Sequence, residues 1–114
     1  MSDEANPSSK AAATQFADIV ALLNVLVPVA IGSHGNFWQN VTRDQFVAKK
    51  VFGRILVVPG DVSKSNLFLA LAGMPPFDGT GFARMPDVVA VPQARYATPA
   101  ELQLVGDWIT AGAP

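Results

Sequence analysis

Residues 55–73 read ILVVPGDVSKSNLFLALAG and contain the chain's most closely spaced turn and helix signals. The stretch begins with a β-branched run and a Pro-Gly turn. Because no partner strand is evident, we expect this run to be an extended connection outside any sheet. Asp61 or Ser63 can then cap a helix that Gly73 ends. The side chains expected on its inner face are Leu67, Phe68 and Leu71.

A first helix is predicted over residues 14–27, where apolar residues recur at helical spacing. Thr14 is a suitable N-cap, and Pro28 ends the pattern. The stripe consists of Phe16, Ile19, Val20, Leu23, Leu26 and Val27, widened by Leu22.

Two further helices are predicted. One covers about residues 43–52, with Asn40 or Thr42 as its cap and Gly53 just after its end. The other begins at residues 98–101, TPAE, which combine a Thr cap, Pro at the first position and Glu three residues on. The pattern therefore indicates an all-α domain over residues 14–114, preceded by a disordered or fraying tail over residues 1–13.

The composition excludes several classes of function and site. The chain has 114 residues, of which 50% are hydrophobic and 15% charged, and its net charge is −1. This composition suits one globular domain with a sizeable core or a lined pocket. No aromatic-lined basic stripe accompanies the densest basic cluster, which consists of Lys49, Lys50 and Arg54, so we expect no nucleic-acid binding. The absence of cysteine excludes disulfides and thiolate metal sites.

The longest apolar run, residues 19–31, is interrupted by Asn24 and Pro28. It is shorter than the about 20 residues that a membrane-spanning helix needs, so no transmembrane segment is expected. No positively charged segment precedes it, which argues against a secretory signal. As written, the sequence predicts a cytoplasmic protein, or a periplasmic one if the chain is a mature form that has lost its signal peptide.

Three segments of the second half carry a resemblance to a known family: residues 55–73, Arg84-Met85-Pro86, and TPAELQLVGDWITAGAP at residues 98–114. In order and spacing they resemble small bacterial class I cytochrome c domains. Those domains show a VPGD-x-x-x-S-x-L segment, a later Met-Pro and a closing helix ending W-I-x-x-G-A. FADIVALLN at residues 16–24 is similar to the helix before the haem-attachment motif. The resemblance implies a cytochrome c-like fold, with three to four helices and long loops around a central pocket.

The attachment motif itself departs from the family, which carries C-x-x-C-H for two thioether links and an iron ligand. Two alignments stay open. The first places Val27, Ala30 and Ile31 at the motif positions. The second needs a three-residue insertion and places Ala30, Ser33 and His34 there, so that the histidine is kept. Both delete both cysteines and exclude covalent haem.

Haem bound without a covalent link would have two candidate axial ligands in this resemblance. His34 is the only histidine, and Met85 stands where the family's methionine ligand stands. We favour a surface loop position for His34 and a core-filling role for Met85, because methionine alone is a weak haem anchor. On that interpretation the protein has no covalent cofactor and no metal site.

A vacated haem pocket has to be filled, because a large void costs stability. The candidate lining aromatics are Phe37, Trp38, Phe77 and Phe82. Collapse of the long Pro- and Gly-rich loop over residues 74–92 or an apolar ligand would also fill it.

Three residues are candidate proton carriers: Asp78, Asp87 and His34. Arg84 and Arg95 lie in or beside the same loop. Carboxylates beside an apolar cavity support acid–base chemistry if burial raises one pKa. Turn capping is the simpler role, and Asp78 is followed by glycine.

Three functional hypotheses follow. We favour a haem-free cytochrome c-like domain whose former pocket is filled or holds a small apolar ligand or a protein partner. The second is an electron carrier with non-covalent haem between His34 and Met85. The third is a small acid–base enzyme, although we do not expect an enzyme. The sequence fits natural and engineered loss of the cysteines equally well.

Overall fold

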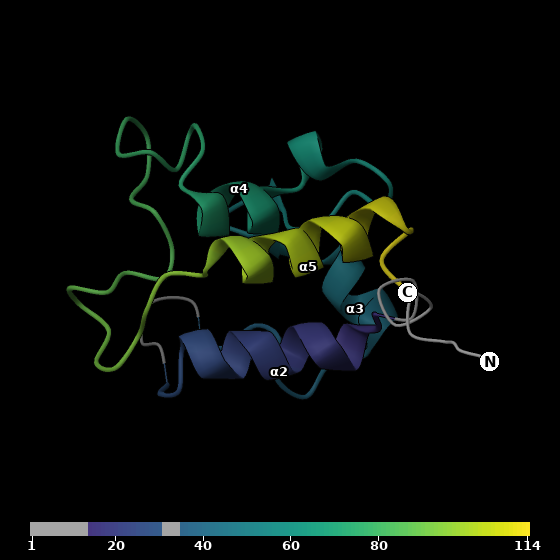
Figure 1. Ribbon diagram of the computed structural model, residues 1–114, viewed down its shortest axis with the longest axis horizontal. Coiled ribbons are helices and arrows are strands. Elements are labelled where there is room, and N and C mark those ends of the chain that lie inside the picture. The colour runs from purple at the N-terminus through teal and green to yellow at the C-terminus, as the bar shows by residue number, and fades with distance from the viewer. Residues whose placement is uncertain (1–13, 31–34) are drawn as a thin grey trace.

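The computed structural model describes residues 14–30 and 35–114, so the tail predicted over residues 1–13 lies outside the described residues. This part of the chain is mostly helical, with one short two-stranded sheet. Long loops cover one end of the helices (Figure 1). No helix in the described part has the length and apolar character needed to cross a bilayer. The elements are α2 (Phe16–Leu26), α3 (Arg43–Ala48), β1 (Lys50–Val51), β2 (Arg54–Ile55), the 3-10 helix η1 (Val62–Lys64), α4 (Asn66–Ala72) and α5 (Pro99–Thr110).

Helix α2 is shorter at both ends than the sequence predicts. Gln15, and not Thr14, is its N-cap, and the Gln15 backbone N–H donates to the Asp18 carboxylate over 2.9 Å. Val27 is the C-cap, because Pro28 cannot continue the hydrogen-bond ladder. The helix buries the predicted apolar stripe through Ile19, Leu22, Leu23 and Leu26.

The region after α3 corrects two expectations. Helix α3 ends at Ala48 and does not reach Phe52, and the β-branched run that we placed outside any sheet pairs with a strand just upstream. The register pairs Val51 with Arg54. Phe52 and Gly53 have φ values of +51° and +77°, the signs that a two-residue type I′ turn requires. Gly53 therefore serves a hairpin and not a helix end.

The segment leading into α4 is held by Ser65, which is completely buried. Its hydroxyl accepts from the Val58 backbone N–H at 2.9 Å and donates to the Asp61 carbonyl at 2.8 Å. The expected cap at Asp61 or Ser63 is wrong for α4: Asp61 is the N-cap of η1, and Ser65 is the N-cap of α4. Helix α4 ends as predicted at Gly73, whose φ is +69°.

Helix α5 begins as predicted. The Thr98 hydroxyl accepts from the Glu101 N–H at 3.2 Å, and the Glu101 carboxylate accepts from the Thr98 N–H at 2.9 Å. Arg95 adds two bonds to the same carboxylate, at 2.8 and 2.7 Å. The Arg95 guanidinium and, after it, the Thr98 N–H lower the pKa of Glu101 to about 2.

An aromatic cluster joins α2, α3 and α5. The ring centroids of Phe16 and Phe46 are 5.1 Å apart, and Trp108 lies 6.4 Å from Phe16 and 6.3 Å from Phe46. Trp108 is fully buried, and its indole N–H donates to the Pro114 carbonyl at 2.7 Å. Helix α5 also contacts α4, so it lies between α2 and α4 (Figure 1).

Candidate functional site

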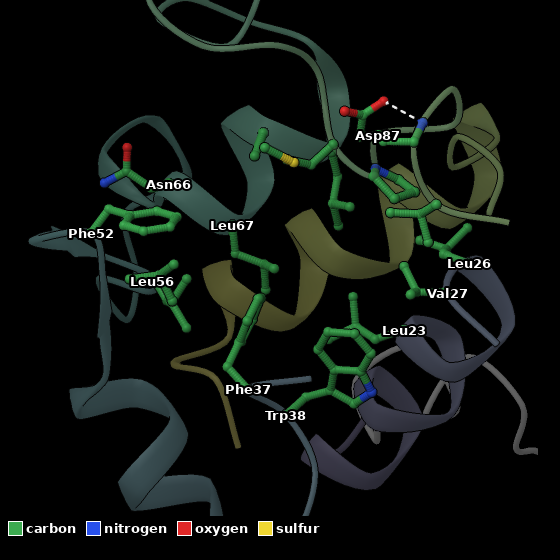
Figure 2. Close-up of a pocket in the computed structure, with 17 residues that line it drawn as sticks. Leu23, Leu26, Val27, Phe37, Trp38, Phe52, Leu56, Asn66, Leu67 and Asp87 are labelled. Carbon is green, nitrogen blue, oxygen red and sulfur yellow. Dashed lines mark hydrogen bonds between the residues drawn. The ribbon is translucent and has the colours of Figure 1, made fainter. Parts of the chain in front are cut away.

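A cavity of about 470 Å³ lies between the end of α2, the hairpin, α4 and the loop that follows α4 (Figure 2). The side chains that line it are almost all apolar. From α2 and the chain after it come Leu23, Leu26, Val27, Phe37 and Trp38. The hairpin and its exit contribute Val51, Phe52 and Leu56, and α4 contributes Asn66, Leu67, Ala70 and Leu71. The long loop contributes Met85, Pro86, Asp87, Ala90 and Val91.

Helical periodicity explains how two of these walls form. Leu67, Ala70 and Leu71 recur at a spacing of three and four residues, so they share one face of α4. The end of α2 presents a similar stripe to the cavity. The two apolar helix faces therefore form opposite walls of the cavity.

Two of the four aromatics proposed as lining meet the cavity. Phe37 and Trp38 pack edge to face, with centroids 5.1 Å apart and planes at 88°. The Trp38 N–H donates to the Asn24 side-chain oxygen at 2.8 Å, so the indole's polar atom is already bonded within the fold. Phe77 and Phe82 do not line the cavity, and they stack on each other at 5.4 Å.

The predicted haem-motif positions are only partly described. Val27 and Met85 both line the cavity. Ala30 instead lines a separate hollow beside the end of α2, which also includes Val27 and several polar side chains. Ile31 and His34 lie outside the described residues.

The two candidate carboxylates are not brought into one site. Asp87 lines the cavity and is half-buried, whereas Asp78 is exposed and is not among the lining residues. The Thr80 hydroxyl and then the Thr80 N–H lower the pKa of Asp78, which favours its charged form. Asp87 accepts from the N–H groups of Val89 and Ala90, each at 3.1 Å, in the turn-capping role that the sequence also allowed.

Arg84 fixes the loop that supplies the outer wall. Its Nε donates to the Leu71 carbonyl at 3.1 Å, and its guanidinium carbon lies 4.4 Å from the Tyr96 ring centroid. The Met85 N–H donates to the Ala70 carbonyl at 3.0 Å. A Cβ at Gly73 would come within 2.7 Å of the Arg84 side chain, so this close approach requires glycine. The second arginine of this region, at position 95, is paired with the α5 cap as described above.

The hairpin contribution was missed by sequence reasoning. Val51 and Phe52 were expected to continue a helix, but they form a strand end and a turn that border the cavity. The adjacent Phe52-Gly53 pair and the following β-branched run were the signal that could have revealed it.

No group of three or more His, Cys, Asp or Glu side chains in the described part of the chain could hold a metal ion. Comparison with known protein families, with curated proteins and with solved structures finds no match.

Proposed function

We propose that this chain is a haem-free, cytochrome c-like domain whose central cavity binds a small apolar molecule. The observation that carries the proposal is the cavity of about 470 Å³ with its nearly continuous apolar lining. Small-molecule sites typically measure about 300–1,000 Å³ and are lined in this way. An empty apolar void lowers stability, and a ligand that binds only the folded chain would restore it.

The position of the cavity supports the cytochrome c-like part of the proposal. In the first alignment, Val27 stands at the first cysteine of the attachment motif, and Met85 stands at the methionine ligand. Both residues line the same cavity although they are far apart in sequence. The mostly helical architecture and the long loop beside the cavity agree with the family's expected layout.

The residues present do not fit covalent haem. The chain has no cysteine, so no thioether can form, and Val27 offers only methyl groups at its motif position. Among the described lining residues, the Met85 thioether is the only soft ligand atom. The lining therefore suits an apolar molecule better than covalently bound haem.

Non-covalent haem is the second candidate, and the placement of Met85 in the cavity wall favours it. It predicts that titrated haem gives an intense Soret band, that this band weakens in Met85→Ala, and that it is lost in His34→Ala. Equal haem uptake by the wild type and both variants would exclude axial ligation by these side chains.

The first test is an absorbance spectrum and a native mass of the purified protein. We expect a colourless, folded protein, with any co-purified molecule visible as added mass. A stoichiometric Soret band would overturn the haem-free interpretation.

The second test measures the binding of Nile red, a neutral apolar dye, by fluorescence titration. Ala70 lies on α4 in the cavity wall, so Ala70→Phe should fill the space and weaken Nile red binding by at least about tenfold. Ala100→Phe adds the same ring at an exposed position of α5 outside the lining and should bind like the wild type.

Val91→Phe, at the partly exposed side of the cavity, provides a second filling variant. A thermal melt of each variant separates lost binding from lost folding. Equal dye binding by the wild type and two folded filling variants would refute the proposed site.

A further inference from the structure

The cavity has one charged lining residue, Asp87. Some polar atoms of the lining side chains are already hydrogen-bonded within the fold, and others are not. Of the lining side chains, only those of Trp38, Asn66 and Asp87 carry nitrogen or oxygen. The Trp38 N–H is bonded to Asn24. The Asn66 amide nitrogen donates to the Ile55 carbonyl at 2.8 Å, which leaves the amide oxygen as an acceptor.

One oxygen of the Asp87 carboxylate holds the local turn, and the other does not. Oδ1 accepts from both Val89 and Ala90. The bond to Ala90 is the dashed line in Figure 2, where Asp87 lies at the edge of the cavity. Oδ2 has no hydrogen-bond or ion-pair partner within residues 14–30 and 35–114. The carboxylate therefore has an open acceptor at the border of an apolar space.

Within the described residues, Arg84 and Arg95 make polar contacts with groups other than Asp87. In the same loop region, Arg84 donates to the Leu71 carbonyl and stacks on Tyr96. Arg95 is paired with the Glu101 carboxylate. Neither arginine forms an ion pair with Asp87 in the described part of the chain, so the carboxylate remains available to a bound molecule.

The turn itself does not require this charge. An asparagine side chain offers the same kind of oxygen acceptor and forms the same type of turn. What aspartate adds is a second acceptor oxygen and a negative charge next to the apolar lining. A charge in that position favours a cationic or hydrogen-bond-donating group and repels a carboxylate.

We propose that the cavity takes an apolar molecule with a protonated amine head, whose chain lies among the aliphatic side chains and whose ammonium group pairs with Asp87. This inference rests on the proposed apolar-ligand function and specifies its ligand class. Each buried methylene strengthens binding about fourfold, so the chain supplies affinity and the head supplies selectivity.

The test displaces Nile red with three molecules of equal chain length: octylamine, octanol and octanoate. At low salt the wild type should bind octylamine about fivefold or more tightly than octanoate, with octanol in between. The preference should shrink as salt is raised, because ions screen a charge at the cavity edge.

Two matched variants assign the preference to one carboxylate. Asp87→Asn keeps the turn acceptor and removes the charge, so the amine preference should fall below about twofold. Asp78→Asn removes a charge from an exposed turn outside the cavity and should keep the wild-type preference. Unchanged thermal melts verify that both variants fold.

The outcomes separate this inference from the function beneath it. Nile red binding without an amine preference, or a preference that persists in Asp87→Asn, overturns the ligand class but leaves the apolar site intact. Failure of Nile red to bind the folded wild type, or binding that both filling variants retain, overturns the apolar site itself, and the ligand class with it.

Discussion

The two ends of α2 belong to differently packed regions. At its start, Phe16, Phe46 and Trp108 form a solid aromatic cluster with centroids 5.1 to 6.4 Å apart. At its end, Leu23 faces a cavity of about 470 Å³. Phe37 belongs to both regions, since it stacks on Phe46 at 6.1 Å and also lines the cavity.

The difference indicates that one part of the core supplies stability and the other leaves space for a ligand. Close-packed aromatic contacts stabilise the fold through dispersion and apolar burial, and each lost contact lowers the free energy of unfolding. The hollow region contributes less stability but leaves space for another molecule. The stability that the aromatic cluster supplies offsets the stability that is lost at the cavity.

The largest effect is expected from truncating the solid region. Phe46 is completely buried, so Phe46→Ala should lower the free energy of unfolding by about 3–5 kcal/mol. Met85→Ala, at a half-buried position beside the cavity, should cost less than about 1 kcal/mol. Urea denaturation measures both, and equal losses would contradict the division between the two regions.

Enlarging an alanine should have opposite effects beside the cavity and at a buried core position outside its lining. Ala70→Leu adds apolar volume facing the cavity and should stabilise the fold by about 1 kcal/mol. Ala97→Leu adds the same atoms at a buried position outside the lining and should destabilise it by about 1–3 kcal/mol through overpacking. Thermal melts would refute the contrast if both variants shifted in the same direction.

A smaller, pH-dependent effect is expected at Glu101, away from both regions. Its pKa falls from 4.5 to about 2, chiefly through Arg95. Because the folded-state pKa is the lower one, its contribution is fully present above pH 4.5 and is lost as pH falls through about 2. Since the pair is partly solvated, Glu101→Gln should cost about 1 kcal/mol at pH 7.

The stability difference between the wild type and Glu101→Gln should close towards pH 2, as denaturation at several pH values would show. Asp44→Asn is the control, since the Asp44 side chain is 88% exposed and should contribute little at any pH. A constant difference between the wild type and Glu101→Gln would argue against the ion pair as its source.

The smallest effect is expected at the hairpin turn. Phe52 is 72% exposed and has a positive φ, which costs a non-glycine residue energy. Phe52→Asn suits a type I′ turn and should raise stability by about 0.5–1 kcal/mol. Because Phe52 lines the cavity, the same variant should weaken Nile red binding. A variant that is more stable and binds the dye unchanged would remove Phe52 from the site.

The sequence predicted helix ends correctly where the signal lay within a few neighbouring residues. The Thr98 cap with Glu101 and the Gly73 end act within one turn of chain, and both are where the sequence predicted. The hairpin was missed because strand pairing depends on two segments at once. The apolar spacing from Phe46 to Val51 is compatible with a helix. In the structure Val51 instead pairs with Arg54 in the hairpin.

The candidate site was only partly predictable. Phe37 and Trp38 line the cavity, whereas Phe77 and Phe82 pack against each other outside it. All four are bulky aromatics in loops, so residue type could not separate them. Which aromatic meets the cavity depends on how each loop packs against the helices, as the hydrogen bond from Arg84 to the Leu71 carbonyl illustrates.

By itself, the sequence determined where α3 and α5 begin and where α4 ends, and it ruled out thioether-linked haem because it contains no thiol. These properties depend on single residues and their nearest neighbours. Only the tertiary structure decided that Val27, Phe52, Met85 and Asp87 border one space. Their proximity arises from the packing of distant elements, which no local pattern encodes.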